Sequence, residues 1–359
     1  MREVELEAVS IRHGDKLALD HASLTVAAGT LVVLIGMSGS GKTSILRAIA
    51  GLDDLASGAV RIGGRDMRGV EPGERDVSMT FQRPALLTTR SVGRNISFPL
   101  ELRRATAEAI AERVGVEARA MHIEHLLDRD VGTLSVGEAQ MVQVARAIVR
   151  TPTVLLLDEP FAALEGERIH VLRREVRLLQ QRFGVTTVMS TNDPQDAMAI
   201  ADRLVVLEQG RIVQCGTARQ VYDFPDTAIA AQLLGPAVIE PALIDVDADG
   251  AWIRHDAFRF RAWQPALRRH AGRRVQLVTR PDWWEIEPHG RISATVRRVR
   301  PTFGGFELSC DVDGHRVTVA PSGAARPPEG VTRGSRIGLR LRHWVVLDPL
   351  DGRRIRLED

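Results

Sequence analysis

Two short runs of apolar residues stand out in the first half of the chain, at positions 31–35 and 154–157. Each run is too short for a buried helix and does not alternate with polar residues, so both predict strands that are buried on both faces. A glycine-rich loop follows the first run, and positions 42–50 then predict a helix that ends before Gly51. A buried strand, a loop and a helix in this order are typical of an α/β fold.

The rest of the first 235 residues is consistent with this class. Alternating apolar and polar residues predict half-buried strands, and charged amphipathic stretches predict helices. Two apolar runs on either side of Gln209 and Gly210 predict a β-hairpin. The other predicted strands lie at 4–11, 22–26 and 185–190, and the other predicted helices lie at 166–183 and 194–201.

The pattern changes between about residues 85 and 150, where long stretches rich in Ala, Arg and Glu replace the short apolar runs. Residues 106–114 and 136–149 show this character most clearly, and both predict helices. We therefore expect a helical subdomain at about 85–150, inserted into the α/β domain.

The pattern changes again after Pro236, where short alternating runs are interrupted by Gly and Pro. Such runs predict a small all-β module, and residues 321–330 predict a long loop within it. A chain of 359 residues exceeds what one core usually fills. We therefore predict two domains, at 1–235 and 236–359. The clearest strand candidates of the second domain are 274–279, 293–299, 317–320 and 336–341.

Composition narrows the possible functions only a little. A content of 44% hydrophobic and 26% charged residues is ordinary for a globular protein, and a net charge of +2 does not favour a nucleic-acid partner. Cys215 and Cys310 lie far apart, which excludes a cysteine zinc cluster and a disulfide framework. We see neither an apolar run of about 20 residues nor a signal peptide. The expectation is a cytosolic chain, or one that docks on a membrane through a partner.

The glycine-rich loop matches the pattern G-x-x-x-x-G-K-[ST], which binds nucleotide phosphates. Glycines allow backbone N–H groups to surround the β-phosphate, and the N-terminus of the following helix adds positive potential. Lys42 can reach the β- and γ-phosphates, and the Thr43 hydroxyl can bind Mg²⁺. The predicted phosphate-binding residues are Gly36, Met37, Ser38, Gly39, Ser40, Gly41, Lys42, Thr43 and Ser44.

The second apolar run ends in two acidic residues, Asp158 and Glu159. A carboxylate at the C-terminal end of a buried strand can hold Mg²⁺, which is the role we expect for Asp158. Glu159 beside it can orient or deprotonate an attacking water molecule. On its own, the pair could equally be a solvated acidic turn, but the phosphate loop in the same chain favours a nucleotide hydrolase.

Residues 134–140, with the sequence LSVGEAQ, lie between these two motifs. Ser135 and Glu138 form a capping-box pattern, so the segment could simply begin the helix at 136–149. The order and spacing of the three motifs nevertheless resemble the ATP-binding subunit of ATP-binding-cassette (ABC) transporters, over about residues 4–235. This resemblance implies a P-loop NTPase cassette that hydrolyses ATP with Mg²⁺.

The resemblance also implies roles for further residues. Gln82 is similar to the glutamine that binds Mg²⁺ and senses the docked membrane subunit. Residues 134–140 are similar to the family signature, in which Ser135, Gly137 and the helix N-terminus would bind the γ-phosphate held by an opposing subunit. Residues 162–165 resemble the D-loop. His13 lies near the position at which the family stacks an aromatic ring on adenine.

This chain departs from the family pattern at four positions. Val136 replaces the first glycine of the signature, Glu138 replaces its glutamine, and Glu165 replaces the D-loop aspartate. Asn192 stands where the family has a histidine that contacts the γ-phosphate and the attacking water. Asn can donate an N–H but cannot carry a proton or a charge. Loss of one such contact typically raises the barrier by ~2–4 kcal/mol, so we expect slower hydrolysis, with Glu159 and Asn192 as the catalytic residues.

The second domain resembles the small β (OB-like) regulatory domain that follows the ATPase in sugar, polyamine, sulfate and iron importers. Residues 277–282 are similar to its opening segment, and residues 341–348 are similar to its closing strand. The tryptophans of this region are predicted to form its core rather than a ligand cage. They are Trp252, Trp263, Trp283, Trp284 and Trp344.

The resemblance as a whole implies an ATPase subunit of a binding-protein-dependent importer, bound peripherally at the cytoplasmic face of the inner membrane. Its partners would be transmembrane permease subunits, a second ATPase subunit and, indirectly, a solute-binding protein. A homodimer is favoured over a heterodimer, and carbohydrate is favoured as substrate over polyamine, sulfate, iron or another small solute. Two alternatives remain: a weakly hydrolysing regulatory subunit paired with an intact partner, and a soluble cassette ATPase without a transport role.

Overall fold

The computed structural model describes residues 2–164, 166–288, 290–302, 304–321 and 323–357. The chain divides into two compact units, Met1–Arg219 and Gln220–Asp359, and each is described by itself. The domain boundary at 235/236 stays a prediction.

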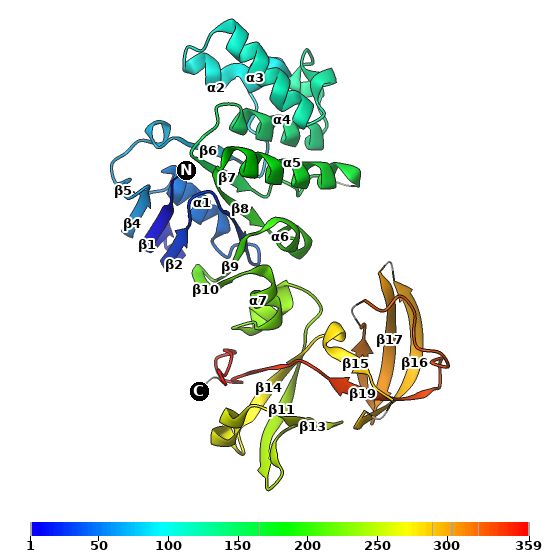
Figure 1. Cartoon of the computed structure of the whole chain (residues 1–359). Coiled ribbons are helices and arrows are strands. Elements are labelled where there is room, and N and C mark those ends of the chain that lie inside the picture. The colour runs from blue at the N-terminus through cyan, green and yellow to red at the C-terminus, as the bar shows by residue number, and fades with distance from the viewer. Residues whose placement is uncertain (1, 165, 289, 303, 322, 358–359) are drawn as a thin grey trace. The chain divides into compact units, whose positions relative to one another are not determined.

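The centre of the first unit is a six-stranded sheet with the order β10-β9-β3-β8-β7-β6 (Figure 1). Strands β9, β3, β8, β7 and β6 run parallel, and β10 pairs antiparallel with β9. All residues of β3 and β7 are buried, as their unbroken apolar runs predict. The strands are β3 Leu31–Ile35, β6 Val77–Thr80, β7 Val154–Asp158, β8 Thr186–Thr191, β9 Arg203–Glu208 and β10 Arg211–Gly216.

The predicted hairpin at 204–214 is confirmed as β9 and β10. Gln209 has φ 48° and Gly210 has φ 81°, the left-handed values that a two-residue type I′ turn requires. The turn also approaches the phosphate loop, because the Gly210 N–H donates to the carbonyl of Ser40 at 3.0 Å.

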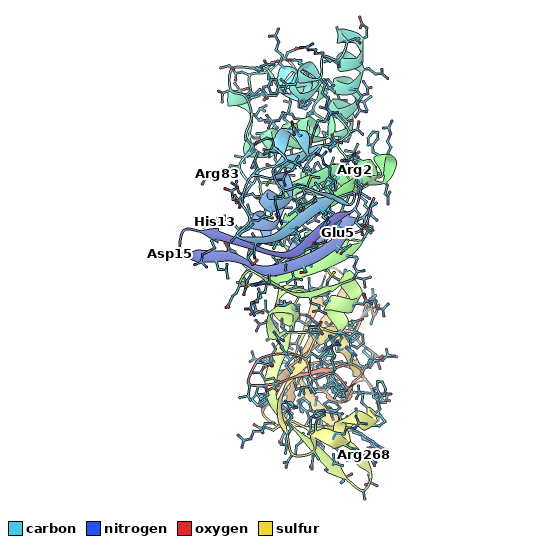
Figure 2. All side chains as sticks on the ribbon, turned by 90° about the vertical axis from the view of Figure 1, so that its left-hand side faces the viewer. Arg2, Glu5, His13, Asp15, Arg83 and Arg268 are labelled. Carbon is cyan, nitrogen blue, oxygen red and sulfur yellow. The ribbon has the colours of Figure 1, made fainter. Side chains whose placement is uncertain are left out.

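A second, antiparallel sheet in the first unit has the order β2-β1-β4-β5. One hydrophobic core joins this sheet to β3 and to helix α1, Lys42–Ala50. The second strand begins at Lys16, earlier than the predicted start at residue 22. Figure 2 shows His13 and Asp15 at the tip of the β1–β2 hairpin. The strands are β1 Val4–His13, β2 Lys16–Val26, β4 Ser57–Ile62 and β5 Arg65–Asp66.

Helices α2, α3 and α4 gather on one side of the first unit, within the predicted helical stretch (Figure 1). Ser91, Thr106 and Ser135 cap their N-termini by accepting hydrogen bonds from backbone N–H groups. No helix of the described part of the chain is long and apolar enough to span a bilayer. The helices of this unit after α1 are α2 Val92–Leu102, α3 Ala107–Ala120, α4 Val136–Ile148, α5 Glu167–Phe183 and α6 Pro194–Ile200.

The second unit contains two five-stranded antiparallel sheets, with the orders β13-β12-β11-β14-β20 and β15-β19-β16-β17-β18. Two short helices that the hydrophobic pattern did not predict precede these sheets: α7 Ala218–Asp223, which spans the boundary between the units, and α8 Ala228–Leu233. The strands are β11 Val238–Asp247, β12 Gly250–Arg254, β13 Arg259–Ala262, β14 Arg274–Thr279, β15 Trp284–Ile286, β16 Ile292–Thr302, β17 Gly305–Val312, β18 His315–Val319, β19 Arg336–Leu341 and β20 Val345–Leu347.

The closing strand predicted at 341–348 is present as β20, but it is shorter than predicted and covers Val345–Leu347. Leu341 ends β19, which pairs with β15 and β16 in one sheet, whereas β20 pairs with β14 in the other. The chain crosses from one sheet to the other between them, at residues 342–344. A hydrophobic pattern shows which residues are extended, but it does not show which neighbour they pair with.

The apolar core of the second unit contains three of its five tryptophans, Trp283, Trp284 and Trp344. Trp252 is buried but lies outside this core, and Trp263 departs from the prediction, because 78% of its surface is exposed. It directly follows β13, at Ala262, where the chain leaves the sheet.

Candidate functional site

The phosphate loop connects β3 to α1, and its glycines are required by close backbone packing. A Cβ atom on Gly36 would collide with the carbonyl of Leu207, and one on Gly41 would lie 2.7 Å from Leu19 Cδ2. Gly41 also has φ 105°, which is unfavourable for other residues. The loop can therefore adopt its tight path only with glycine at these positions.

Lys42, the first residue of α1, points back into the loop. Its Nζ donates to the carbonyl oxygens of Gly36 at 2.8 Å and of Met37 at 3.0 Å. Burial lowers the pKa of Lys42, while the nearby carboxylates of Glu159 and Asp158 oppose the shift. The ammonium group is thus held, largely desolvated, at the place where the sequence motif puts the phosphates.

Asp158 ends β7 and is buried beneath the loop. Thr43 Oγ1 donates to its two carboxylate oxygens at 3.1 and 3.0 Å, and Ser190 Oγ donates to Oδ1 at 2.6 Å. Ser190 lies on β8, the strand next to β7. The sequence-based reasoning did not identify this partner, because it depends on the pairing of two strands that are distant in sequence.

Glu159 follows Asp158 and receives hydrogen bonds from two sides. Gln82 Nε2 donates to its Oε2 at 3.0 Å, and Asn192 Nδ2 donates to its Oε1. Its backbone has φ 45°, a conformation that costs a non-glycine residue ~1–3 kcal/mol, and its N–H is held by Ser190 Oγ at 3.0 Å. The fold thus fixes the carboxylate between Gln82 and Asn192.

A pocket of about 240 Å³ brings most of the predicted site residues together. Lys16 and Ala18 of β2 also line it, although the sequence-based reasoning had not selected them. His13 lies at its edge, with Nε2 3.2 Å from Asp53 Oδ2. The predicted residues that line the pocket are His13, Ser38, Gly39, Gly41, Lys42, Thr43, Ser44, Gln82, Glu159 and Asn192.

The signature segment begins α4, and the described residues that line the pocket do not include Ser135 or Gly137. Ser135 and Glu138 form the predicted capping box: the Ser135 N–H donates to Glu138 Oε2 at 2.8 Å, and the Glu138 N–H donates to Ser135 Oγ at 3.3 Å. A Cβ on Gly137 would lie 2.9 Å from Leu164 Cδ2, so α4 packs closely on the segment that resembles the D-loop. Glu165 of that segment lies outside the described residues.

The donor set at the phosphate loop fits a hard divalent cation. Asp158 and Thr43 present a carboxylate and a hydroxyl at one point, and Gln82 adds a side-chain amide oxygen. Oxygen donors of this kind suit Mg²⁺. These three residues would hold the ion, which would neutralise charge on the nucleotide phosphates.

Asn192 offers a direct test of the hydrolytic geometry, since its amide already contacts Glu159. We expect Asn192→His to hydrolyse ATP about 30-fold faster, the lower end of ~2–4 kcal/mol, because an imidazole can carry a proton and a positive charge beside the γ-phosphate whereas Asn supplies only a neutral donor. Steady-state phosphate release at saturating ATP measures the effect, and Asn192→Ala, which removes the donor, should be slower than the wild type. Equal rates for all three proteins would show that this position does not influence turnover.

Comparison with known proteins agrees with this geometry. A family model described as ABC transporter matches residues 19–162. The sn-glycerol-3-phosphate import ATP-binding protein of Roseobacter denitrificans is 35% identical over 93% of this chain and 91% of its own length. The Fe(3+) ions import ATP-binding protein of Brucella melitensis is 38% identical over 82% of this chain and 83% of its own length.

A solved structure provides a further comparison. A dimeric ATP-binding cassette in a post-hydrolysis state, bound to ADP and Pi, is 26% identical, with a TM-score of 0.57. The match covers 60% of this chain and 99% of that one. The phosphate loop, the carboxylate pair and the α/β sheet thus occur together in a fold known from such cassettes. The chain therefore belongs to the ABC transporter family, as one of its ATP-hydrolysing cassettes.

Proposed function

We propose that this chain is the ATPase subunit that energises a binding-protein-dependent importer. The observation that carries the proposal is the fixed position of Glu159, at the edge of the phosphate pocket and bonded to Gln82 and Asn192. The relatives compared above are import ATP-binding proteins, which supports the transport role.

In the proposed reaction, the backbone N–H groups of the phosphate loop and Lys42 bind the phosphates of ATP. Glu159 accepts a proton from the attacking water, and Asn192 and Gln82 hold its carboxylate in place. Asp158, Thr43 and the amide oxygen of Gln82 would hold Mg²⁺, and His13 would face the adenine.

We propose that two copies of the chain bind ATP between them. Ser135 and Gly137 begin α4, and the described residues that line the pocket include neither. Val136 beside them is 63% exposed, as expected of a residue that meets a second subunit. The dimeric cassette to which this fold is similar supports the arrangement.

Glu138 places a negative charge at the surface proposed to receive the partner's γ-phosphate. Its carboxylate accepts hydrogen bonds from both the N–H and the hydroxyl of Ser135, and these bonds lower the pKa of Glu138. The carboxylate is therefore ionised at neutral pH. It also occupies two donors that a phosphate would otherwise use.

We expect Glu138→Gln to lower the KM for ATP several-fold, because the change removes this repulsion. The gain should shrink as salt is raised, since ions screen exposed charges. Glu112→Gln, on the exposed surface of α3, is the matched control. An unchanged KM in Glu138→Gln at low salt would contradict a phosphate-binding role for this surface. Steady-state kinetics over a range of ATP concentrations provide the measurement.

The proposed partners are transmembrane permease subunits, which would dock near Gln82 and residues 85–130 and hold the chain at the cytoplasmic face of the inner membrane. A solute-binding protein would act indirectly, and we expect no nucleic-acid partner. The test is affinity purification of the tagged chain from detergent-solubilised membranes of its own host. Recovery of a permease is the expected result. A chain that is never recovered with a permease would favour a cassette without a transport role.

For the substrate, we propose a carbohydrate or a phosphorylated derivative of one, supported by the relative named for sn-glycerol-3-phosphate. Uptake of labelled sugars and sn-glycerol-3-phosphate by cells with and without the gene tests this. Uptake of sulfate, Fe³⁺ or polyamine that depends on the gene would overturn the substrate class while leaving the ATPase role intact.

A further inference from the structure

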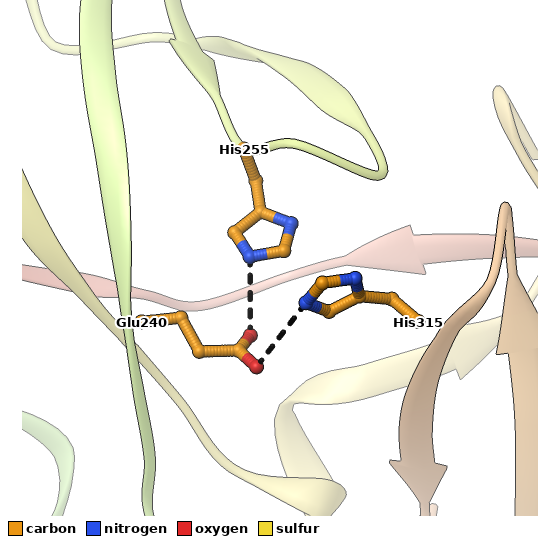
Figure 3. A group of neighbouring side chains, drawn as sticks. All are labelled: Glu240, His255 and His315. Carbon is orange, nitrogen blue, oxygen red and sulfur yellow. Dashed lines mark ion pairs between the residues drawn. The ribbon is translucent and has the colours of Figure 1, made fainter.

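Three side chains that are distant in the sequence meet in the second unit: Glu240, His255 and His315. His255 Nε2 lies 3.3 Å from Glu240 Oε2, and His315 Nε2 lies 3.7 Å from Glu240 Oε1 (Figure 3). One ligand atom from each residue lies within 4.8 Å of the other two. The two imidazole rings are nearly perpendicular, with centroids 4.7 Å apart.

The fold brings these residues together from both sheets of the unit. Glu240 lies in the first half of β11, which pairs with β14 on one side. On the other side, β12 pairs with β11 only from Leu243 onward, so within the described part of the chain no strand pairs with β11 there at Glu240. His255 follows the last residue of β12 at this point. His315 begins β18, directly after the Asp313–Gly314 turn that joins it to β17. The edge of β11 left open by β12, the β12–β13 hairpin and the β17–β18 hairpin therefore meet at this cluster.

The burial and the chemistry of the three side chains suit a metal-binding site. His255 is 5% exposed and lies against both the Glu240 carboxylate and the His315 ring. Glu240 and His315 are half-buried, which leaves a side open to solvent. Two imidazoles and one carboxylate form a common three-ligand set for zinc, with a water molecule as fourth ligand.

We propose that Glu240, His255 and His315 form a binding site for a divalent transition-metal ion, with Zn²⁺ the best match. The ion would join β11 and β12 of one sheet to β18 of the other. The site lies within the second unit, shares no residue with the nucleotide pocket and does not depend on the substrate of transport.

One contact must change when the metal binds. The Ala257 N–H donates to His255 Nδ1 at 3.2 Å, so in the metal-free protein the proton of the neutral ring is on Nε2, facing Glu240. A metal on Nε2 displaces that proton and leaves Nδ1 as the protonated nitrogen. A protonated Nδ1 is a hydrogen-bond donor, so it can no longer accept the hydrogen bond from the Ala257 N–H. Metal binding therefore requires His255 to give up its contact with the Ala257 N–H.

The test is calorimetric titration of Zn²⁺ into the full chain, after chelator treatment and without nucleotide. We expect one high-affinity Zn²⁺ per chain in the wild type and an affinity at least about tenfold weaker in His315→Ala. His315 lies at the start of a strand and is half-buried, so its loss should leave the unit folded. His170→Ala, on the exposed face of α5, is the matched control and should bind as the wild type does.

Thermal unfolding provides a second readout, because an ion that binds the folded chain raises its midpoint. Zn²⁺ should raise the midpoint of the wild type and of His170→Ala but not that of His315→Ala or Glu240→Gln. The absence of saturable binding in the wild type would overturn the proposal, as would equal binding by His315→Ala. Because neither readout uses ATP, failure here would leave the proposed function untouched.

Discussion

Replacing Glu159 by Gln should slow ATP hydrolysis about 10²–10⁴-fold while leaving nucleotide binding close to that of the wild type. The change removes the proton acceptor but keeps a side chain of the same shape between Gln82 and Asn192. Phosphate release measures turnover, and fluorescence of a labelled nucleotide measures affinity. Together they separate loss of chemistry from loss of binding.

Glu167→Gln is the matched control for this experiment, since Glu167 is exposed at the start of α5. Its turnover should equal that of the wild type. If Glu159→Gln kept a rate within a few-fold of the wild type, another group would have to act as the base. If the wild type itself bound ATP without turnover above Glu159→Gln, the purified chain would require a partner subunit to complete its sites.

Replacing Lys42 by Ala should weaken ATP binding by about 10- to 150-fold, which corresponds to the ~1.5–3 kcal/mol of a hydrogen bond to a charged group. Two losses combine: the ammonium group that would meet the phosphates, and the two bonds from Nζ to the carbonyls of Gly36 and Met37. We expect the loop to lose its fixed path as well as its charge. Isothermal titration with ATP and Mg²⁺ provides the measurement.

Lys16→Ala is an unusually close control for this experiment. Lys16 lines the same pocket but is exposed at the start of β2, where a charge is largely solvated. Its loss should change ATP affinity by only a few-fold. Equal weakening by the two variants would mean that the pocket attracts ATP by overall charge rather than through the geometry of Lys42.

The first unit was largely predictable because its signals are local. The unbroken apolar runs of β3 and β7 indicated buried strands, and Gln209–Gly210 indicated the turn between β9 and β10. The phosphate loop could also be predicted, since its glycines and Lys42 are adjacent in sequence.

The contacts that orient the site residues were not predictable, because they depend on strand pairing. The bond from Ser190 to Asp158 exists because β7 and β8 are neighbours, and the bond from Gln82 to Glu159 joins residues 77 positions apart. The same holds for His255 and His315, which meet only because two hairpins from different sheets converge. Periodicity indicates which face of an element is buried, but it does not indicate which element covers that face.

The strand order of the second unit determines when it can fold during synthesis on the ribosome. A ribosome delivers the chain from its N-terminus, and domains generally fold as units in that order. Every strand of the first unit has been synthesised once Gly216 is added. In the second unit, β19 lies between β15 and β16 in one sheet, and β20 forms the edge beside β14 in the other. Neither sheet is complete until residues 336–347 have been synthesised. The first unit can fold as soon as its last strand has been synthesised, whereas the second unit can close only after residues 336–347 have followed more than 100 residues later.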